Sequence, residues 1–551
     1  MAVASRVSAV VILGAVVLAV ACSDTSGPGV LASCGAHGTQ LSLAVAEFAS
    51  LDPATDSGCV TFPAVSSSDT MEWLVLPWSA GGTMGAHAAF ALQTASAGAA
   101  AIAPLFSARP SNRRAIPVAF DHFLREVGRT RRYPVMGRSS SSATPSAPQP
   151  VSMAGPPTVG SVRTFKVCSN ATCSSLANVG ARARSVGIHI AIYVDTLAPA
   201  PGLPTSDLDS LRDVFDTRLY PLDTLTFGHV SDIDSNTVVV VLMTNQVNKL
   251  VTATQCNNAG YIAGFFWPGD LGPGASQNYN NGEIFYSIVP DSLGTLSCRH
   301  KNSEVNNVMP VTFTHEFQHM INFVEHVLVR SGDSEDGWLD EGLSKYAEEI
   351  AGRSFGDNAH FSQFAIGDVF DAYQYLNDPD NTPLLIPADT GTLAMVGASW
   401  LFTRYVVDQY GDSLPGRLVR STTTGAANVA QQTGQPFDVL VSRWALANWV
   451  DSLPGFTTPP ELQYTSWNFR RTFAGLHAQD AADFPLAFPL VPTVSPDNAV
   501  NVSGSLWSGS GAYVRVMRPA GGAAFTLRLT NGSGSPVSAA VAPRLIILRI
   551  R

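Results

Sequence analysis

The chain is poor in charge and has no excess of positive charge. Charged residues make up 14% of the 551 residues, and the formal net charge is −10. A protein with this balance has no electrostatic reason to bind polyanions, so nucleic acid is not an expected partner. We interpret the one basic cluster as a solvated linker surface. It consists of Arg113, Arg114, Arg125, Arg129, Arg131 and Arg132.

Long apolar runs are missing from the interior of the sequence. Hydrophobic residues account for 45% of the chain, which is too many for a disordered protein. No interior run, however, approaches the roughly 20 apolar residues that a membrane-spanning helix needs. The chain is also too long for one hydrophobic core, so we expect several domains.

The one marked apolar run lies at the N-terminus. Arg6 precedes it and small residues end it, which indicates an export signal over residues 1–22. The run closes on LAVAC, which resembles the lipobox of bacterial lipoproteins, and Cys22 would then carry the lipid anchor. The leucine stands one place further from the cysteine than usual, so simple secretion is the alternative. We therefore expect a protein anchored to a membrane in the periplasm or at the cell surface, or secreted.

Cysteine is scarce, and no CxxC pair suggests a thiolate zinc site. The six cysteines other than Cys22 fall into three neighbouring groups. The simplest interpretation is three local disulfides in an oxidising compartment, although the sequence alone cannot choose among pairings. The pairs are Cys34 with Cys59, Cys168 with Cys173, and Cys256 with Cys298.

Composition divides the rest of the chain. Short apolar stretches between Gly, Ser and Asp clusters predict a small β domain over residues 23–125. Arg, Ser and Pro dominate residues 126–160, a composition that buries too little apolar surface to fold and therefore predicts a linker. Strand-like segments return over residues 459–551 and predict a C-terminal β module.

Residues 161–458 form the largest expected domain. Segments 187–195 and 236–244 are apolar and rich in β-branched residues, as buried strands are. After about residue 309 the apolar residues recur mainly at helical spacing. Strands followed by helices predict an α+β fold, with a mixed sheet before a helical region.

The sequence HEFQH carries the clearest chemistry. Two histidines four positions apart on a helix project from one face, and His315 and His319 meet that condition in a helix expected over residues 310–329, with Pro310 in its first turn. Imidazoles of this kind bind Zn²⁺. Glu316 can reach a water on the metal without binding the metal, so it is the expected general base. The alternative is a chance pairing among scattered histidines, which the apolar helical setting disfavours.

No histidine completes HExxHxxGxxH, so a metzincin arrangement is excluded and a carboxylate must serve as third ligand. Glu341, on a helix expected over residues 338–352, is the candidate. Trp338 and Leu339 before it would press this helix against the first. Asp340 is the nearest rival.

Three further residues lie close to these motifs. Glu348 lies about two helical turns beyond Glu341, and we interpret it as solvated. Glu325 and His326 follow His319, and we interpret them as surface residues or as groups that support the ligands.

Several separated motifs resemble the hyicolysin family of metallopeptidases, which are gluzincins with thermolysin and aminopeptidase N among their broader relatives. They are AGYIAGFFWPGDL, GEIFYSIVPD, HEFQHMINF, DGWLDEGLSKYAEE, GASWLFTRYVVDQYG and SRWALANW, which occur in this order within residues 160 to 455. The resemblance implies a gluzincin-type catalytic domain. It also implies that His315, His319 and Glu341 bind Zn²⁺ and that Glu316 is catalytic.

Two positions depart from the family pattern. Relatives commonly have an acidic residue where this chain has Lys345, and a tyrosine where it has Val396. The residue that would stabilise an oxyanion is therefore unassigned, and Tyr346, Tyr373 and Tyr405 are candidates.

The sequence thus predicts an extracytoplasmic zinc-dependent endopeptidase acting on proteins or peptides by direct attack of water. Residues 282–289 are β-prone and precede the metal helix, so we expect them to bind an extended substrate at a sheet edge. One alternative is a weakened or inactive peptidase-fold binding protein or adhesin, which the flanking β modules, Lys345 and Val396 would suit. Another is a lipoprotein in which a closed zinc site only stabilises the fold.

Overall fold

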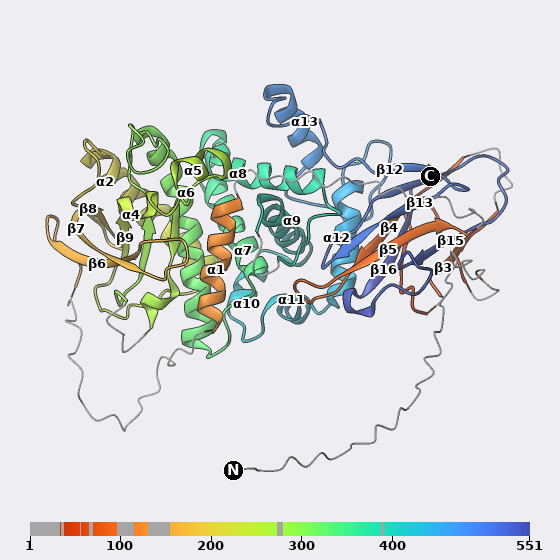
Figure 1. Ribbon diagram of the computed structural model, residues 1–551, viewed down its shortest axis with the longest axis horizontal. Coiled ribbons are helices and arrows are strands. Elements are labelled where there is room, and N and C mark those ends of the chain that lie inside the picture. Colours follow the sequence, from red (N-terminus) through yellow and green to blue (C-terminus); the bar gives the residue numbers. More distant parts are fainter. Residues whose placement is uncertain are drawn as a thin grey trace, which may run out of the picture.

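The computed structural model describes residues 34, 38–55, 57–64, 70–95, 115–130, 155–272, 279–386 and 391–551 (Figure 1). Cys22, the expected export signal and most of the expected linker lie outside these residues. The fold is α+β, as predicted. Helices occupy the middle of the molecule, a mixed sheet lies at one end and a β-sandwich at the other (Figure 1). None of the described helices is long and apolar enough to cross a bilayer.

A six-stranded mixed sheet forms the first part of the expected catalytic domain. Its order is β10 (Gly264–Phe266), β11 (Ile284–Ser287), β9 (Val239–Met243), β8 (Ile190–Asp195), β7 (Leu176–Val186) and β6 (Val162–Cys168). Strands β8, β9 and β11 run parallel, and β10 is antiparallel to β11. All residues of β9 are buried, which fits its run of valines in a strand covered on both faces.

The position of β11 corrects one prediction. Residues 282–289 contain β11, which lies between β9 and β10 and therefore offers no free edge. The edge strand next to β11 is β10, and the other edge strand is β6. The three residues of β10 are too few to give a strand signal in the sequence. Strand β10 lies beside α6 (Asn302–Phe323), the helix that contains HEFQH.

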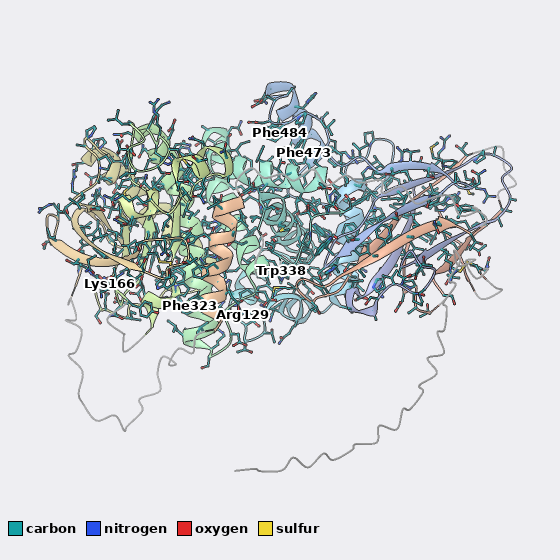
Figure 2. The ribbon with its side chains drawn as sticks, in the orientation of Figure 1. Arg129, Lys166, Phe323, Trp338, Phe473 and Phe484 are labelled. Carbon is teal, nitrogen blue, oxygen red and sulfur yellow. A yellow bond between two sulfur atoms is a disulfide. The ribbon has the colours of Figure 1, made fainter. Side chains whose placement is uncertain are left out.

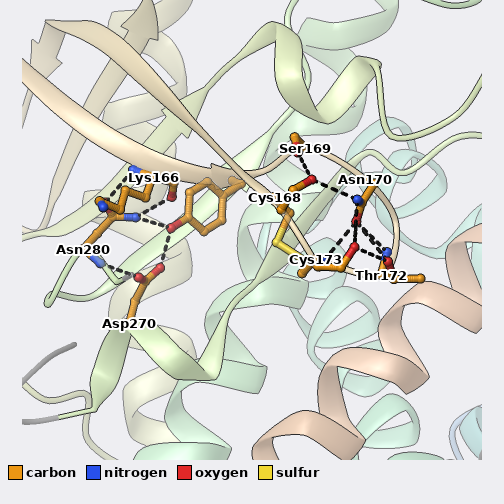
Figure 3. The surroundings of a disulfide bond; sticks show 11 residues. Lys166, Cys168, Ser169, Asn170, Thr172, Cys173, Asp270 and Asn280 are labelled. Carbon is orange, nitrogen blue, oxygen red and sulfur yellow. Dashed lines mark hydrogen bonds between the residues drawn. A yellow bond between two sulfur atoms is a disulfide. The ribbon is translucent and has the colours of Figure 1, made fainter. Parts of the chain in front are cut away.

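Short helices surround this sheet. They are α2 (Thr205–Val214), η1 (Phe215–Leu219), α3 (Tyr220–Thr226), α4 (Asn245–Asn248), α5 (Ala253–Ala259) and η2 (Pro268–Leu271). Asp270 in η2 accepts hydrogen bonds from the Tyr286 hydroxyl of β11 and from the Asn280 backbone (Figure 3). These contacts fix η2 at the end of β10.

The helical region follows. Its elements are α6 (Asn302–Phe323), η3 (Val324–Val329), α7 (Gly337–Ser354), α8 (Asn358–Asn377), α9 (Leu393–Tyr410), α10 (Leu414–Val419), α11 (Gly425–Thr433), α12 (Phe437–Val450), η4 (Pro460–Leu462) and α13 (Phe469–Gln479). Trp338 and Leu339 are fully buried, and Figure 2 places Trp338 within this helical layer. A Cβ added at Gly342 would lie 2.7 Å from the Ser399 carbonyl oxygen, so this glycine allows α7 to approach α9 closely.

Helix α6 begins earlier than its sequence predicts. It starts at Asn302, where the Glu304 side chain accepts a 2.8 Å hydrogen bond from the Lys301 backbone N–H. Pro310 therefore lies inside the helix rather than in its first turn. The Glu304 interaction at the N-terminus was the missed start signal.

The two expected β modules form one β-sandwich. One sheet has the order β1 (Thr39–Gln40), β3 (Cys59–Phe62), β15 (Phe525–Thr530), β5 (His87–Thr94) and β13 (Asn501–Trp507). The other has the order β12 (Thr493–Pro496), β14 (Val514–Arg518), β4 (Met71–Ser79), β16 (Pro543–Arg549) and β2 (Phe48–Leu51). In Figure 1 the red strands from the beginning of the chain lie between blue strands from its end.

Separate modules over residues 23–125 and 459–551 were therefore a wrong prediction. Strand β4 pairs with β14 and β16, and β5 pairs with β13 and β15, so neither half can bury its sheet faces alone. The helical and mixed-sheet region is inserted between the two halves. Local patterns show that a segment is a strand but not which distant strand it pairs with.

Residues 115–130 correct the expected linker boundary. They form one helix, α1 (Ala115–Thr130), across the boundary expected at residue 126. Val118, Phe120 and Leu124 are buried, so an apolar face lies beneath the arginines. The basic composition had obscured this amphipathic pattern.

All three expected disulfides are present, joining Cys34 to Cys59, Cys168 to Cys173, and Cys256 to Cys298. The second closes the turn between β6 and β7, where the Asn170 side chain also accepts hydrogen bonds from the backbone (Figure 3). Disulfides are typical of proteins outside the cytoplasm.

Candidate metal centre

Helix α6 brings the two histidines of HEFQH together. The Nε2 atoms of His315 and His319 lie 3.1 Å apart. His319 is fully buried, whereas 12% of the His315 side chain is exposed. Both ring nitrogens therefore face one point beside a small opening.

Helix α7 adds the third predicted ligand. Glu341 Oε2 lies 3.6 Å from His315 Nε2, and Glu341 Oε1 lies 3.5 Å from His319 Nε2. One ligand atom from each of the three residues lies within 4.8 Å of the others. The residues predicted from the sequence thus form a group that could hold a metal ion.

The environment of Glu341 fits a cation. Its Oε1 is buried and has no hydrogen-bond partner among the described residues. Burial raises the pKa of this carboxyl group to about 7. An unpaired buried carboxylate is costly, and a cation would remove that cost. Two imidazoles and one carboxylate are also the donor set of catalytic zinc sites, which leave one coordination position open.

A carboxylate lies beside the Nδ1 atom of each imidazole, on the side of the ring away from Nε2. Glu348 Oε1 lies 2.7 Å from His315 Nδ1, and Asp340 Oδ2 lies 3.0 Å from His319 Nδ1. When Nδ1 carries the ring proton and donates it in a hydrogen bond to the carboxylate, the lone pair of Nε2 is free to bind a metal. Asp340, the rival for third ligand, therefore supports a ligand instead.

The interpretation of Glu348 as solvated was wrong. Glu348 is only 4% exposed. A residue two turns further along a helix returns to the same face, so Glu348 lies on the face of α7 that carries Glu341. That spacing places Glu348 behind His315 rather than beyond the site. This is the supporting residue that the sequence interpretation missed.

Lys345 gives the first departure from the family pattern a physical role. Its Nζ lies 3.3 Å from Glu348 Oε1, 3.3 Å from Asp368 Oδ1 and 3.6 Å from Asp371 Oδ2. Burial alone would raise the pKa of Glu348, but Lys345 and His315 lower it. Lys345 thereby keeps ionised the carboxylate that supports His315.

The two histidines differ in their preferred charge. Burial lowers the pKa of His319 to about 3, so this ring is neutral, which is the form that binds metal. Burial also opposes a charge on His315, but Glu348, Glu316 and Glu341 raise its pKa to about 9. Metal binding must therefore displace a proton from the His315 site.

Glu316 lies beside the ligand group but outside it. Its Oε2 accepts a 2.8 Å hydrogen bond from the Phe266 backbone N–H of β10. Burial raises the pKa of its carboxyl group. Glu316 and His315 line a cavity of about 350 Å³ together with Gly264 of β10 and Lys345. Its position suits a base that serves water in this cavity.

Helix α1 contributes two residues that the sequence interpretation did not assign to the site. Arg125 Nε lies 3.7 Å from Asp340 Oδ2, and both side chains are nearly buried. Asp121 lines the same cavity as His315 and Glu316. Burial, Glu341 and Glu316 raise the pKa of Asp121.

The three candidate tyrosines do not line this cavity in the described part of the chain. The Tyr405 hydroxyl donates a 2.6 Å hydrogen bond to the Glu461 carbonyl. The Tyr373 hydroxyl accepts a 2.7 Å hydrogen bond from the Leu486 backbone. The Tyr346 ring packs against the Arg404 guanidinium. These contacts engage all three rings elsewhere.

Glu325 and His326 are both buried, so the interpretation of them as surface residues is wrong. Glu325 accepts a 2.7 Å hydrogen bond from the His229 backbone and pairs with Arg330. His326 Nε2 lies 3.6 Å from Glu335 Oε2. The segment after α6 is covered by residues from elsewhere, which a local pattern cannot reveal.

Two other groups in the described residues bring potential ligands together. Cys256 and Cys298 lie beside His300, but their sulfur atoms form a disulfide. Asp232, Asp234 and Glu283 form an acidic cluster. Arg163, whose NH1 lies 3.6 Å from Asp234 Oδ2, offsets part of its charge.

Fold and site together define an α+β protein with a candidate divalent-metal centre between two helices and the edge of a mixed sheet. A scan against protein-family models finds no match, and a search of curated proteins finds no match either. The resemblance to the hyicolysin family therefore rests on the motifs.

Proposed function

We propose that this chain is an exported zinc-dependent endopeptidase. The observation that carries the proposal is the separation of the expected ligands from the expected base. His315, His319 and Glu341 converge on a point, while Glu316 is held outside this group by the Phe266 backbone N–H and lines the cavity that His315 also lines. A closed structural zinc site would need a fourth protein ligand and no adjacent base.

The residues account for hydrolysis without a covalent intermediate. Zinc, when bound, would polarise the peptide carbonyl and lower the pKa of water to about 7. Glu316 accepts the proton of the attacking water and returns it to the leaving amine. The Phe266 N–H holds one carboxylate oxygen, and burial raises the pKa of Glu316 above its usual value, which makes the carboxylate a stronger base.

The edge strand β10 supports an extended peptide as substrate. It pairs with β11 on one side only, and its first residue, Gly264, lines the cavity that Glu316 also lines. A peptide can add to such an edge as another strand, which would present its carbonyl groups to the site.

Export is part of the proposal. Three disulfides support an oxidising compartment. Lipidation at Cys22 would hold the enzyme at a membrane.

The test compares Glu316→Gln with wild type on an unfolded protein substrate. We expect the variant to retain one zinc per chain and to lose activity on the order of a hundredfold to ten-thousandfold. Glu304→Gln, an exposed change on the same helix, is the matched control and should match wild type. Full activity in Glu316→Gln would refute the proposal.

A further inference from the structure

We propose that helix α1 covers the edge strand β10 and thereby prevents substrate from reaching the cavity beside Glu316. It packs on the edge strand β10 and directs Asp121 into the cavity beside Glu316. The structure is then a closed form, and substrate reaches the site only when α1 moves away. This inference rests on the proposed peptidase function and concerns its regulation.

The first observation is where α1 packs. The Phe120 ring meets the Phe265 ring edge to face at 5.1 Å, and the Arg125 guanidinium lies 5.7 Å from the centre of the Phe266 ring. Phe265 and Phe266 are two of the three residues of β10. The helix thus covers the strand along which an extended peptide would add.

The second observation is the unpaired carboxylate of Asp121. Its Oδ1 is buried and has no hydrogen-bond partner in the described parts of the chain. It lines the cavity of His315 and Glu316, where Glu341 is a further carboxylate within electrostatic range. A buried carboxyl oxygen without a partner is unfavourable, and a nearby cation would reduce that cost. A bound metal would therefore favour the closed position of α1.

The third observation is a close approach at the end of α1. A Cβ added at Gly128 would lie 3.2 Å from Pro268 Cγ and 3.3 Å from Ser334 Oγ. Glycine allows α1 to rest against both η2 and the segment before α7. Arg125, paired with Asp340 behind His319, adds a contact to the metal centre itself. Helix α1 thus contacts η2, the segment before α7, and Asp340 of α7.

The test measures access to the metal as well as turnover. The full zinc-loaded chain is mixed with a chromogenic chelator, and the rate of zinc release is recorded beside cleavage of an unfolded protein. Phe120→Ala removes the contact with β10 and touches no expected ligand. We expect zinc release about tenfold faster, which corresponds to about 1.4 kcal/mol less stability of the closed form, and faster cleavage. Arg129→Ala, an exposed change on α1, should release zinc at the wild-type rate.

The opposite experiment locks α1. In Gly128→Cys/Ser334→Cys the two side chains lie within reach of a disulfide. The oxidised protein should release zinc at least tenfold more slowly than its reduced form and should not cleave substrate. Each single-cysteine variant and wild type receive the same mild reduction as controls.

The outcomes separate this inference from the proposed function. Unchanged zinc release in Phe120→Ala, or equal zinc release and cleavage by the oxidised and reduced locked proteins, would overturn it. If no variant cleaves any substrate but zinc release follows the expected order, α1 covers the metal centre and the peptidase proposal has failed.

Discussion

The Nδ1 atom of His315 lies 2.7 Å from Oε1 of Glu348, across the interface between α6 and α7. The same two helices supply all three expected ligands, so this contact ties the orientation of a ligand to the packing of the helices that carry the site. Lys345 is part of the arrangement because it pairs with Glu348 from the other side.

Loss of the Glu348 carboxylate should weaken metal binding. Glu348→Gln removes the charge that orients His315, and we expect zinc affinity to fall about 10- to 100-fold. Competition with a chelator of known affinity measures this change. Glu304→Gln provides the control on an exposed carboxylate. Unchanged zinc affinity in Glu348→Gln would show that the contact does not support the ligand.

Loss of the Lys345 charge should destabilise the fold. Lys345→Met leaves Glu348 and Asp368 buried without the lysine that pairs with both, and we expect the free energy of unfolding to fall by about 3–5 kcal/mol. Denaturant unfolding of the metal-free protein measures it. Lys301→Met removes an exposed lysine paired with Glu304 and should change the free energy by less than about 1 kcal/mol. Equal effects of the two substitutions would contradict the role of Lys345.

His326 should make the metal-free fold sensitive to acid. Burial lowers the pKa of His326 to about 4, from about 6.5 in the unfolded chain. As the pH falls below 6.5, His326 is protonated in the unfolded chain but stays neutral in the folded chain until about pH 4. The free energy of unfolding therefore decreases between these pH values. Between pH 7 and pH 5 the loss amounts to about 2 kcal/mol.

The test of this prediction compares wild type with His326→Gln at both pH values. The comparison is needed because burial raises the pKa of the neighbouring Glu335 to about 8. Protonation of Glu335 stabilises the fold as the pH falls from 7 to 5, which opposes the effect of His326. We expect wild type to lose about 2 kcal/mol more than the variant on acidification. A parallel loss in both proteins would rule out His326 as the cause.

The β-sandwich should require both ends of the chain. Removal of all residues before 155 deletes β1 to β5 together with α1 and leaves β13, β14, β15 and β16 with unpaired edges. Unpaired edges promote association, so we expect residues 155–551 alone to aggregate. Size-exclusion chromatography against the chain from residue 34 onward measures this. A monomeric 155–551 fragment with native strand content would instead support two independent modules.

The sequence predicted that the three expected ligands come together because their geometry is local. Histidines four positions apart on a helix share a face whatever surrounds them, so His315 and His319 follow from spacing alone. Glu341 needed a second helix packed on the first. Trp338 and Leu339 are buried, but the Trp338 ring packs against Phe402 of α9 and Phe437 of α12.

Residues governed by distant contacts were missed. Glu348 was interpreted as solvated because nothing nearby in the sequence shows that His315 and Lys345 would enclose it. The site residues of α1 were hidden within an arginine-rich segment, although Val118, Phe120 and Leu124 carried the signal of a buried face. The pairing of β4 with β16 depends on residues at opposite ends of the chain, which no local pattern encodes.

X-ray absorption at the zinc edge of the loaded protein tests the central claim most directly, because it reports the atoms around the metal. The account predicts two imidazole nitrogens and carboxylate oxygen at about 2.0–2.2 Å, a further light atom from water, and no sulfur at about 2.3 Å. It also predicts loss of that pattern in Glu341→Gln. A sulfur neighbour, fewer than two imidazoles, or an unchanged spectrum in Glu341→Gln would contradict a centre built from His315, His319 and Glu341.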